Sequence, residues 1–232
     1  MDPRLRAAVD ASLGWYGDLC ALHGVAASLE DGLWWSRTSP PPLHSDAVVV
    51  EPGVTARQVV DRLAGRPRCG VKDSFATLDL TEGDLGVLFD ASWMHREAPA
   101  TTSSQSGPSG SPGSPGWSRV SSAAELAVWT SLHDTTGVLL PGLLDRAHFA
   151  VLARYSEGRI VAGAVARLAG GAVDVSNTYA VPGHDLDWSE LVGVIADRFP
   201  GRPLVGYTRG RELDDAVDAG FSVVGDLRVW TR

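Results

Sequence analysis

The sequence predicts an α/β protein with mixed β-sheets flanked by helices, arranged as two similar lobes. Helix-type and strand-type patterns alternate along most of the 232 residues, which favours layered sheets covered by helices. A stretch rich in Ser, Gly and Pro interrupts this alternation near the middle of the chain. The segment before that stretch resembles the segment at the end of the chain, which indicates a repeated unit.

The first half begins with a predicted helix over residues 5–23, because its apolar side chains recur at three- and four-residue spacing. Gly24 then suits a helix C-terminus. A second helix is predicted after Thr55, since Thr55 and Gln58 have the spacing of a capping box, in which each side chain satisfies a free amide of the other residue. Apolar and β-branched runs predict strands at 32–36, 46–50, 69–71, 85–89 and 91–94.

Residues 98–116 are predicted to be a disordered linker between an N-terminal lobe, 1–97, and a C-terminal lobe, 117–232. Ser, Gly, Pro and Thr dominate this stretch, and apolar residues nearly vanish from it. Such a segment cannot bury enough apolar surface to offset the entropy lost on ordering. We therefore expect a flexible tether.

The second half is predicted to start with a strand at 117–120 and a helix that begins at a capping box formed by Ser122 and Glu125. The predicted strand 159–168 is rich in small residues, so a helix or a ligand is expected to pack closely against it. Further strands are predicted at 149–155, 172–181, 204–207, 221–224 and 227–230, and helices at 187–199 and 212–219.

Residues 61–96 align with residues 197–232 at a constant offset of 136, without a gap. Ten of these 36 positions are identical, whereas unrelated segments would share about two or three from residue frequencies alone. Two α/β segments of biased composition are the alternative explanation. The unbroken register favours duplication of one unit.

Composition argues against several functions. The net charge of −8 and the pI near 5.2 disfavour nucleic acid and anionic membranes as partners, because both bind through positive charge. No apolar run approaches the ~20 residues of a membrane span, and the N-terminus lacks the apolar core of a signal peptide. Cys20 and Cys69 make no disulfide framework, so a cytoplasmic protein is expected. Cys20 and His23 lack a second ligand pair, and no metal site is predicted.

From Val173 onward the predicted order is β-α-β-α-β-β, with Ala-Gly-Phe at residues 219–221. This order resembles the C-terminal half of the GCN5-related N-acetyltransferase (GNAT) superfamily. The resemblance implies an N-acyltransferase that transfers an acyl group, expected to be acetyl, from acetyl-CoA to a small-molecule amine. In that family the first β-to-α turn holds the pyrophosphate of the cofactor. The residues implied to bind the cofactor here are Tyr179, Ala180, Val181, Gly183 and Ser189.

This turn departs from the family pattern, which is Arg or Gln, two residues, Gly, one residue, then Gly or Ala. Ala180 and Asp185 replace the first and last of these, and Pro182 removes an amide donor. Asp187 and Glu190 are predicted to be the N-terminal cap of the following helix and its partner. With Asp185 they place three carboxylates where phosphate would bind, and like charges a few Å apart repel by on the order of 1 kcal/mol each. Two alternatives follow: a degenerate, non-catalytic GNAT-like protein that binds a small ligand or a protein, or an acyltransferase that uses a carrier other than free CoA.

Acyl transfer to an amine needs a base for the amine and an acid for the leaving group. In the family the acid is often a Tyr on the last helix, which has none here, so Tyr207 on the preceding strand is the candidate acid. Asp174, His184 and Glu157 are the candidate bases. Three of these candidates have an ordinary alternative: Tyr207 as a strand residue packed on a helix, Asp174 as a solvated carboxylate and His184 as part of a surface turn.

Two further residues are candidates for contact with the substrate. Asn177 is placed to hydrogen-bond either a substrate or only its own bulged strand. Trp34 and Trp35 are adjacent in a predicted strand, so their rings face opposite sides of the sheet and one should lie outside the core. Trp35 is the candidate for that exposed, substrate-binding ring.

Overall fold

A computed structural model describes residues 1–98 and 116–232. The helices of this part are α1 (Pro3–Leu22), α2 (Ala56–Arg62), α3 (Ala123–Leu132), α4 (Trp188–Arg198) and α5 (Arg211–Asp218), with 3-10 turns at Thr81–Gly83 and Pro141–Leu143. The strands are β1 (Ala27–Glu30), β2 (Leu33–Ser36), β3 (Ala47–Val49), β4 (Gly70–Asp73), β5 (Gly86–Arg96), β6 (Gly116–Arg119), β7 (Phe149–Ser156), β8 (Arg159–Ala169), β9 (Ala172–Ala180), β10 (Leu204–Thr208) and β11 (Ser222–Thr231).

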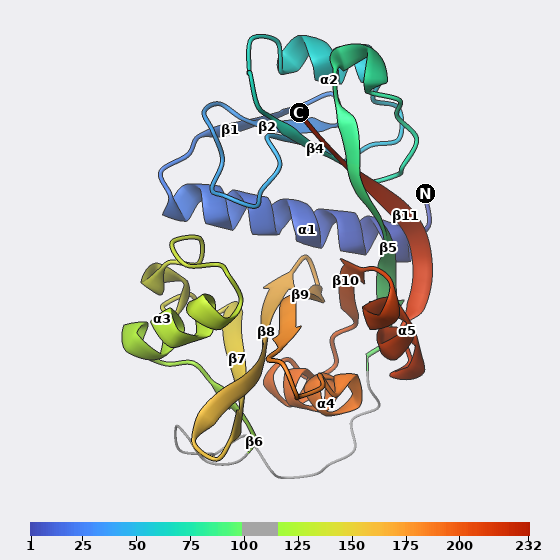
Figure 1. Cartoon of the computed structure of the whole chain (residues 1–232). Helices are drawn as coiled ribbons and strands as arrows, with labels where there is room; N and C mark the ends of the chain where they lie inside the picture. Colours follow the sequence, from blue (N-terminus) through green and yellow to red (C-terminus); the bar gives the residue numbers. More distant parts are fainter. Residues whose placement is uncertain (99–115) are drawn as a thin grey trace.

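The predicted mixed α/β class is confirmed, and the strands of both halves join in one sheet. Their order is β1-β2-β3-β4-β11-β5-β10-β9-β8-β7-β6. The β3–β4 and β9–β10 pairs are parallel, and the remaining neighbours are antiparallel. In Figure 1 the early strands lie above α1 and the later strands lie below it, while β5 and β11 run past α1 and join the two groups.

Helix α1 covers the middle of one face of this sheet. Asp2 caps its N-terminus by accepting a hydrogen bond from the Arg4 amide at 2.8 Å, and Pro3 occupies the first turn. Ala8, Val9 and Leu19 of α1 are fully buried in the same hydrophobic cluster as residues of β5, β7 and α3. Helices α2, α4 and α5 belong to two other clusters, which pack on the opposite face. The sheet is thus covered on both faces, with α1 and α3 on one side.

Each half contributes its last strand to the other half. β5 lies between β11 and β10, and β11 lies between β4 and β5. The β5–β11 pairing keeps its register under the 136-residue offset, since Ser222 pairs with His95 and Gly86 pairs with Thr231. The two strands therefore pair about a local two-fold relationship, as the repeat in the sequence would require.

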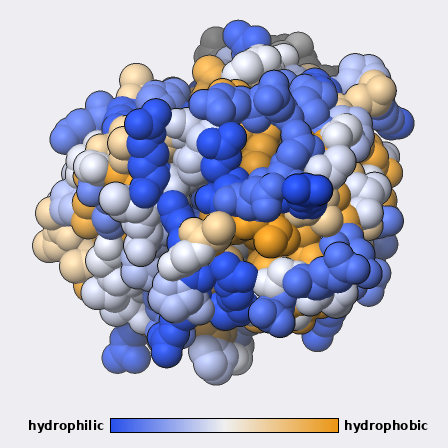
Figure 2. All heavy atoms as spheres, turned by 90° about the horizontal axis from the view of Figure 1, so that it is seen from above, coloured by the Kyte–Doolittle hydropathy of each residue, from blue (hydrophilic) through white to orange (hydrophobic). Residues whose placement is uncertain are grey.

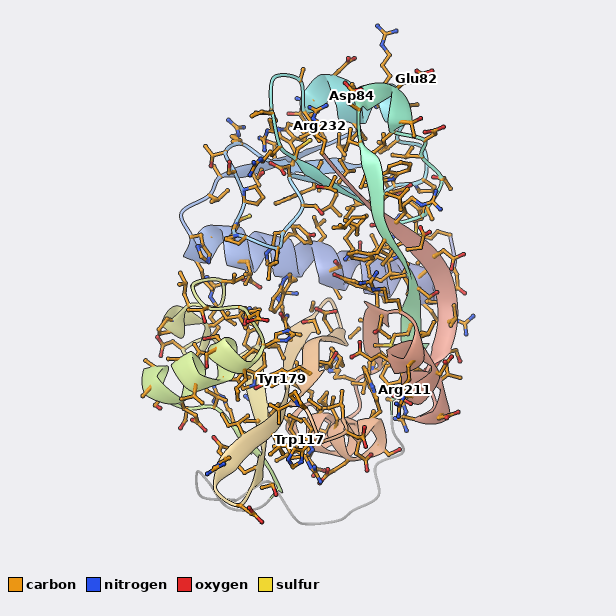
Figure 3. The ribbon with its side chains drawn as sticks, in the orientation of Figure 1. Glu82, Asp84, Trp117, Tyr179, Arg211 and Arg232 are labelled. Atoms are coloured by element: carbon orange, nitrogen blue, oxygen red, sulfur yellow. The ribbon has the colours of Figure 1, made fainter. Side chains whose placement is uncertain are left out.

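Arginines at the ends of these strands repeat the same relationship. Arg96 Nε donates to the carbonyl oxygen of Ala219 at 2.9 Å, and Arg232 Nη1 donates to the carbonyl oxygen of Gly83 at 2.7 Å. The two acceptors are themselves 136 residues apart. Figure 3 places Arg232 close to the turn that carries Glu82 and Asp84.

Several expected elements differ from those in the structure. The predicted strands 221–224 and 227–230 are one strand, β11, with a bulge between Val223 and Gly225. The predicted strands 85–89 and 91–94 are likewise one strand, β5. The reason is that β5 and β11 pair with each other along their length instead of folding back as hairpins. Residues 99–115 of the expected linker lie outside the described residues, and Gly116 already belongs to β6.

The expectation that one ring of the Trp34–Trp35 pair is exposed was wrong. Their exposed fractions are 5% and 8%. Trp34 packs against Tyr16 of α1, with ring centroids 5.3 Å apart, and the Arg62 guanidinium of α2 lies 3.8 Å from the Trp35 ring centroid. Helices cover both faces of β2, so neither ring is free. At the α2 end of the molecule the surface is mainly hydrophilic, with hydrophobic side chains visible between polar ones (Figure 2).

The small residues of β8 make room for a helix, which is one of the two alternatives that the sequence left open. A Cβ atom at Gly163 would lie 2.4 Å from Trp129 Nε1 of α3 and 2.3 Å from the Tyr179 ring. Trp129 Nε1 donates to the carbonyl oxygen of Leu152 at 2.8 Å, which fixes the indole over β8. Glycine at this position therefore allows α3 to approach the sheet closely.

Candidate functional site

A cavity of about 280 Å³ lies between α1 and the sheet. Both halves of the chain build it: α1 and β4 come from the first half, and β9, β10 and the segment after α3 come from the second. The residues that line it are Ser12, Trp15, Tyr16, Leu43, His44, Lys72, His133, Thr135, Val138, Asp174, Ser176, Asn177, Thr178 and Tyr207.

The cavity lies where β9 and β10 separate. The two strands pair only from Val173 to Val175 on the β9 side. Asn177 then adopts a left-handed backbone, with φ 52°, at an irregularity in the β8–β9 pairing. Ser176 and Thr178 on either side line the cavity instead of continuing the ladder with β10.

Lys72 reaches the cavity from β4 and is 1% exposed. Its Nζ donates to Ser12 Oγ at 2.8 Å and lies 3.7 Å from the ring centroid of Tyr207 and 4.6 Å from that of Trp93. Aromatic faces attract a cation, whereas burial disfavours it. Burial dominates and lowers the pKa of Lys72 to about 7, although the charge of Asp174 opposes the change. The amine therefore gains or loses its proton near neutral pH.

Asp174 faces the same cavity from β9 and is 3% exposed, so the expectation of a solvated carboxylate was wrong. Burial raises the pKa of Asp174 to about 6, while the charges of Lys72 and Arg167 oppose the change. Arg167 is itself paired with Asp18, at 2.6 Å between Nη2 and Oδ2. Asp174 is thus a carboxylate that can accept a proton close to neutral pH.

Tyr207 lines the cavity from β10 and keeps 37% of its surface exposed. Its ring meets Trp93 edge-on, with centroids 5.4 Å apart. The pKa of the Tyr207 phenol is raised, mainly because its surroundings desolvate the phenolate, and further by Tyr16 and Asp174. The hydroxyl therefore keeps its proton at neutral pH and remains a hydrogen-bond donor.

The two histidines of the cavity are neutral. Burial lowers the pKa of His44 and that of His133. Trp15 Nε1 donates to His44 Nε2 at 2.9 Å, and His44 Nδ1 lies 2.9 Å from the carbonyl oxygen of Pro42, an arrangement that fits the tautomer with the proton on Nδ1. Lys72 and Asp174 are consequently the two lining residues that carry charge.

A second, more open cleft of about 580 Å³ lies at the turn between β9 and α4. Ala180, His184 and Ser189 line it together with Arg211 of α5, which Figure 3 shows on the side of α5 near α4. Asp185, Asp187, Glu212, Asp215 and Asp218 also line this cleft. Carboxylates therefore dominate the charge of its walls.

The N-terminus of α4 is capped from within the chain, as the sequence predicted. Asp187 accepts a hydrogen bond from the Glu190 amide at 2.9 Å. The His184 amide donates to the carbonyl oxygen of Val181 at 3.0 Å, and the Val181 amide donates to that of Val161 at 2.9 Å. These amides are already paired and are not free to bind an anion.

Glu212 of α5 bridges the gap between the separated strands. Thr178 of β9 donates to one of its carboxylate oxygens, and Thr208 Oγ1 of β10 donates to the other at 2.6 Å. The carboxylate of Glu212 thereby ties together the two strands beyond the point where their ladder ends.

Solved structures with the same arrangement of elements span this chain almost entirely. A putative acetyltransferase of the GNAT family from Novosphingobium aromaticivorans aligns with a TM-score of 0.60 and 16% identity over 100% of this chain and 98% of its own. A GCN5-related N-acetyltransferase from Kribbella flavida aligns with a TM-score of 0.59 and 13% identity, over 97% and 95% of the two chains. The chain has a GNAT fold. Comparison of the sequence alone finds no matching family model and no matching curated protein.

Acetyl-CoA is the cofactor expected from the sequence resemblance, and its phosphates call for cations and free amide donors. The cleft at α4 instead presents five carboxylates beside Arg211 and His184. The tip of α4 is capped by Asp187, and Glu212 occupies the gap between β9 and β10. The residues of this cleft do not fit free CoA bound at the α4 N-terminus.

The structure brings some of the predicted site residues together and separates others. Tyr207, Asp174 and Asn177 share the cavity under α1. His184 lies in the other cleft, and Glu157 sits in the exposed β7–β8 turn. Gly183 has φ 87° in the turn before α4. Trp35 lies beside Arg62 and Arg66, away from both the cavity under α1 and the cleft at α4.

Tyr179, predicted to contact a cofactor, points toward α3. Its ring stacks on His133 and meets Trp129 edge-on, with centroids 5.0 Å apart in both cases. Its hydroxyl donates to the carbonyl oxygen of Trp129 at 3.4 Å. Tyr179, labelled in Figure 3, therefore packs against α3 and is not among the residues that line the cavity.

Lys72 is the site residue that sequence reasoning missed. Of the 20 lysine and arginine residues, it is the single lysine. It directly follows the predicted strand 69–71, and the structure places it inside β4, where a charged side chain is unusual. A lone lysine in an apolar strand was the available signal, because a buried amine shifts its pKa far more readily than a guanidinium does.

Within residues 1–98 and 116–232 there is no group of three or more His, Cys, Asp and Glu side chains arranged to hold a metal ion. In the same ranges, none of the helices has the length and hydropathy needed to cross a membrane.

Proposed function

We propose that this protein is an N-acyltransferase whose acceptor amine binds in the cavity under α1 and whose acyl donor is a carrier other than free CoA. One observation carries the proposal: Asp174 and Tyr207 project from neighbouring strands of a GNAT fold into the same cavity. The first is a carboxylate able to accept a proton near neutral pH, and the second is a phenol that keeps its proton.

The chemistry follows from these two groups. Asp174 accepts one proton from the substrate ammonium, and the nitrogen lone pair then attacks the carbonyl carbon of the acyl donor. As the C–N bond forms and the bond to the leaving group breaks, Tyr207 gives its proton to the leaving group. The second proton of the nitrogen returns to the Tyr207 oxygen, so the net products are the amide, the protonated leaving group and one proton on Asp174.

The test compares two thioester donors that share the reactive acetyl group. Acetyl-CoA carries the phosphates, and S-acetyl-N-acetylcysteamine does not. Each is incubated with the protein and a panel of amines, with and without carboxylates, and the amide is detected by mass spectrometry. We expect amide from S-acetyl-N-acetylcysteamine, no higher rate from acetyl-CoA, and no calorimetric heat with acetyl-CoA at about 1 mM. Micromolar binding of acetyl-CoA, or amide from acetyl-CoA alone, would contradict the donor assignment.

A second candidate is a GNAT-fold protein that binds a small ligand without catalysis. The bridge of Glu212 to Thr178 and Thr208 supports it, because that bridge occupies the gap through which a donor would approach. Absence of amide with every donor and amine, together with binding of an amine in the cavity, would favour this candidate.

We also propose that the chain arose by duplication into lobes 1–97 and 117–232, with the last strands exchanged, and that it works in the cytoplasm. The symmetric β5–β11 register supports the duplication. Cys20 and Cys69 are both buried free thiols, which suits a reducing compartment.

A further inference from the structure

We infer that the acceptor is an amino-acid-like zwitterion, with its carboxylate bound by Lys72 and its ammonium bound by Asp174. This inference rests on the proposed function and names the class of substrate. It starts from the charge pattern of the cavity, whose lining holds one cationic side chain and one anionic side chain.

Lys72 and Asp174 do not satisfy each other directly. Both are almost fully buried, yet the ion pairs within 4.0 Å in the described residues include none between them. A structural pair in a core would close to contact distance, because a buried charge without a partner costs several kcal/mol. Here each group faces the cavity, with the other near enough to affect its protonation.

The partners of Lys72 leave it free to bind an anion. An ammonium has three N–H donors, and Nζ donates one of them to Ser12 Oγ. The rings of Tyr207 and Trp93 attract the positive charge but accept no strong hydrogen bond. A ligand carboxylate would take the remaining donors and supply the counter-charge that the buried amine lacks.

A second buried group in the cavity also lacks a partner. Thr135 is 3% exposed, and its Oγ1 has no hydrogen-bond partner. Buried hydroxyl groups are normally hydrogen-bonded. A polar ligand in the cavity would satisfy Thr135, which points to a molecule with several polar atoms.

The size and shape of the cavity limit the ligand further. A volume of about 280 Å³ is just below the range of pockets for drug-sized ligands, which begins at about 300 Å³. Trp15 and Val138 add apolar surface to the polar walls. A single amino acid fits this description better than a peptide chain.

Titration calorimetry without any acyl donor tests the inference. The probes are the twenty L-amino acids and their α-amides, in which the carboxylate is replaced by a neutral group. We expect at least one amino acid to bind, with its amide at least tenfold weaker. Lys72→Met should lower the affinity for the amino acid at least tenfold and change the affinity for its α-amide less than about twofold. Arg57→Gln, an equal loss of charge at an exposed helix position, is the matched control.

A measurement on the unmodified chain covers the case in which Lys72→Met does not fold. Because Lys72 is the single lysine, 13C-labelled lysine gives one ε-carbon NMR signal that reports its protonation. A bound carboxylate should raise the pKa of Lys72 by at least about one unit. No binding by any amino acid up to about 10 mM, equal affinities for acids and amides, or an unchanged pKa on binding would overturn the inference.

The outcomes separate this inference from the proposed function. Binding of an amino acid through Lys72, without amide formation from any donor, would sustain the inference and refute the function. Equal acylation rates for amino acids and for amines that lack a carboxylate would sustain the proposed function and refute the inference.

Discussion

The Nζ atom of Lys72 lies 3.7 Å from the ring centroid of Tyr207. The two residues come from different halves of the chain, on β4 and β10, and two strands, β11 and β5, lie between them in the sheet. The lysine side chain reaches over these strands beneath α1, past Trp93 of β5. The cavity therefore exists only when both halves fold together, and its chemistry depends on the strand exchange.

Tyr207→Phe should slow acyl transfer according to the leaving group. Removal of the phenolic proton donor should cost on the order of 100-fold with an alkyl thioester, whose thiolate is basic. The loss should shrink with an aryl thioester, since its thiolate leaves without a proton. Rates for the two thioesters with wild type and variant give the answer, and an equal loss with both would argue that Tyr207 only shapes the cavity.

Lys72 should make the free energy of unfolding depend on pH. Its pKa in the folded protein is about 7, below its ordinary value of 10.5. Between these values the unfolded chain binds the proton and the folded chain does not, so stability rises as pH increases from about 7 to about 10.5. The rise should be a few kcal/mol and should be absent in Lys72→Met. Urea unfolding across this range measures it, and parallel curves for the two proteins would contradict the buried, shifted amine.

The acidic cleft should be convertible toward CoA. Asp185→Gly combined with Glu212→Gln removes two carboxylates from the cleft, each of which is expected to repel phosphate by on the order of 1 kcal/mol. Affinity for acetyl-CoA in calorimetry should therefore rise by about tenfold or more. Glu212→Gln should also lower the free energy of unfolding by about 1–2 kcal/mol, because it weakens the bridge between Thr178 and Thr208.

Asp61→Asn, which neutralises an exposed carboxylate on α2, is the control for that experiment. Unchanged acetyl-CoA affinity in the double variant would show that carboxylate repulsion is not what excludes the cofactor.

Local patterns in the sequence were enough to predict the helices, most of the strands and the cap of α4 by Asp187. The sequence also singled out Asp174 and Tyr207 as a candidate base and the candidate acid, and the structure places them on the neighbouring parallel strands β9 and β10. The exchange of β5 and β11 could not be predicted from the sequence, because the pattern of each strand is that of the last strand of its own half. The bridge from Glu212 to Thr178 was equally hidden, because it joins residues 34 positions apart through tertiary structure.

The burial of Lys72 and Asp174 shows the same limit. Asp174 in a strand after Val173 resembles an ordinary alternating, solvated carboxylate. In the structure α1, from the far end of the chain, packs against β9, and Asp174 is buried. The depth of a side chain beneath a long-range helix cannot be derived from its neighbours in sequence. The composition offered one hint, the single lysine.

The central claim is that Asp174 accepts the proton of an amine that becomes acylated in the cavity under α1. The most direct measurement is the initial rate of amide formation from S-acetyl-N-acetylcysteamine, followed by mass spectrometry, for wild type, Asp174→Asn and the control Asp61→Asn. The account predicts amide from wild type and control, and a rate at least about 100-fold lower for Asp174→Asn, with all three proteins folded by circular dichroism. Equal rates for wild type and Asp174→Asn would contradict it.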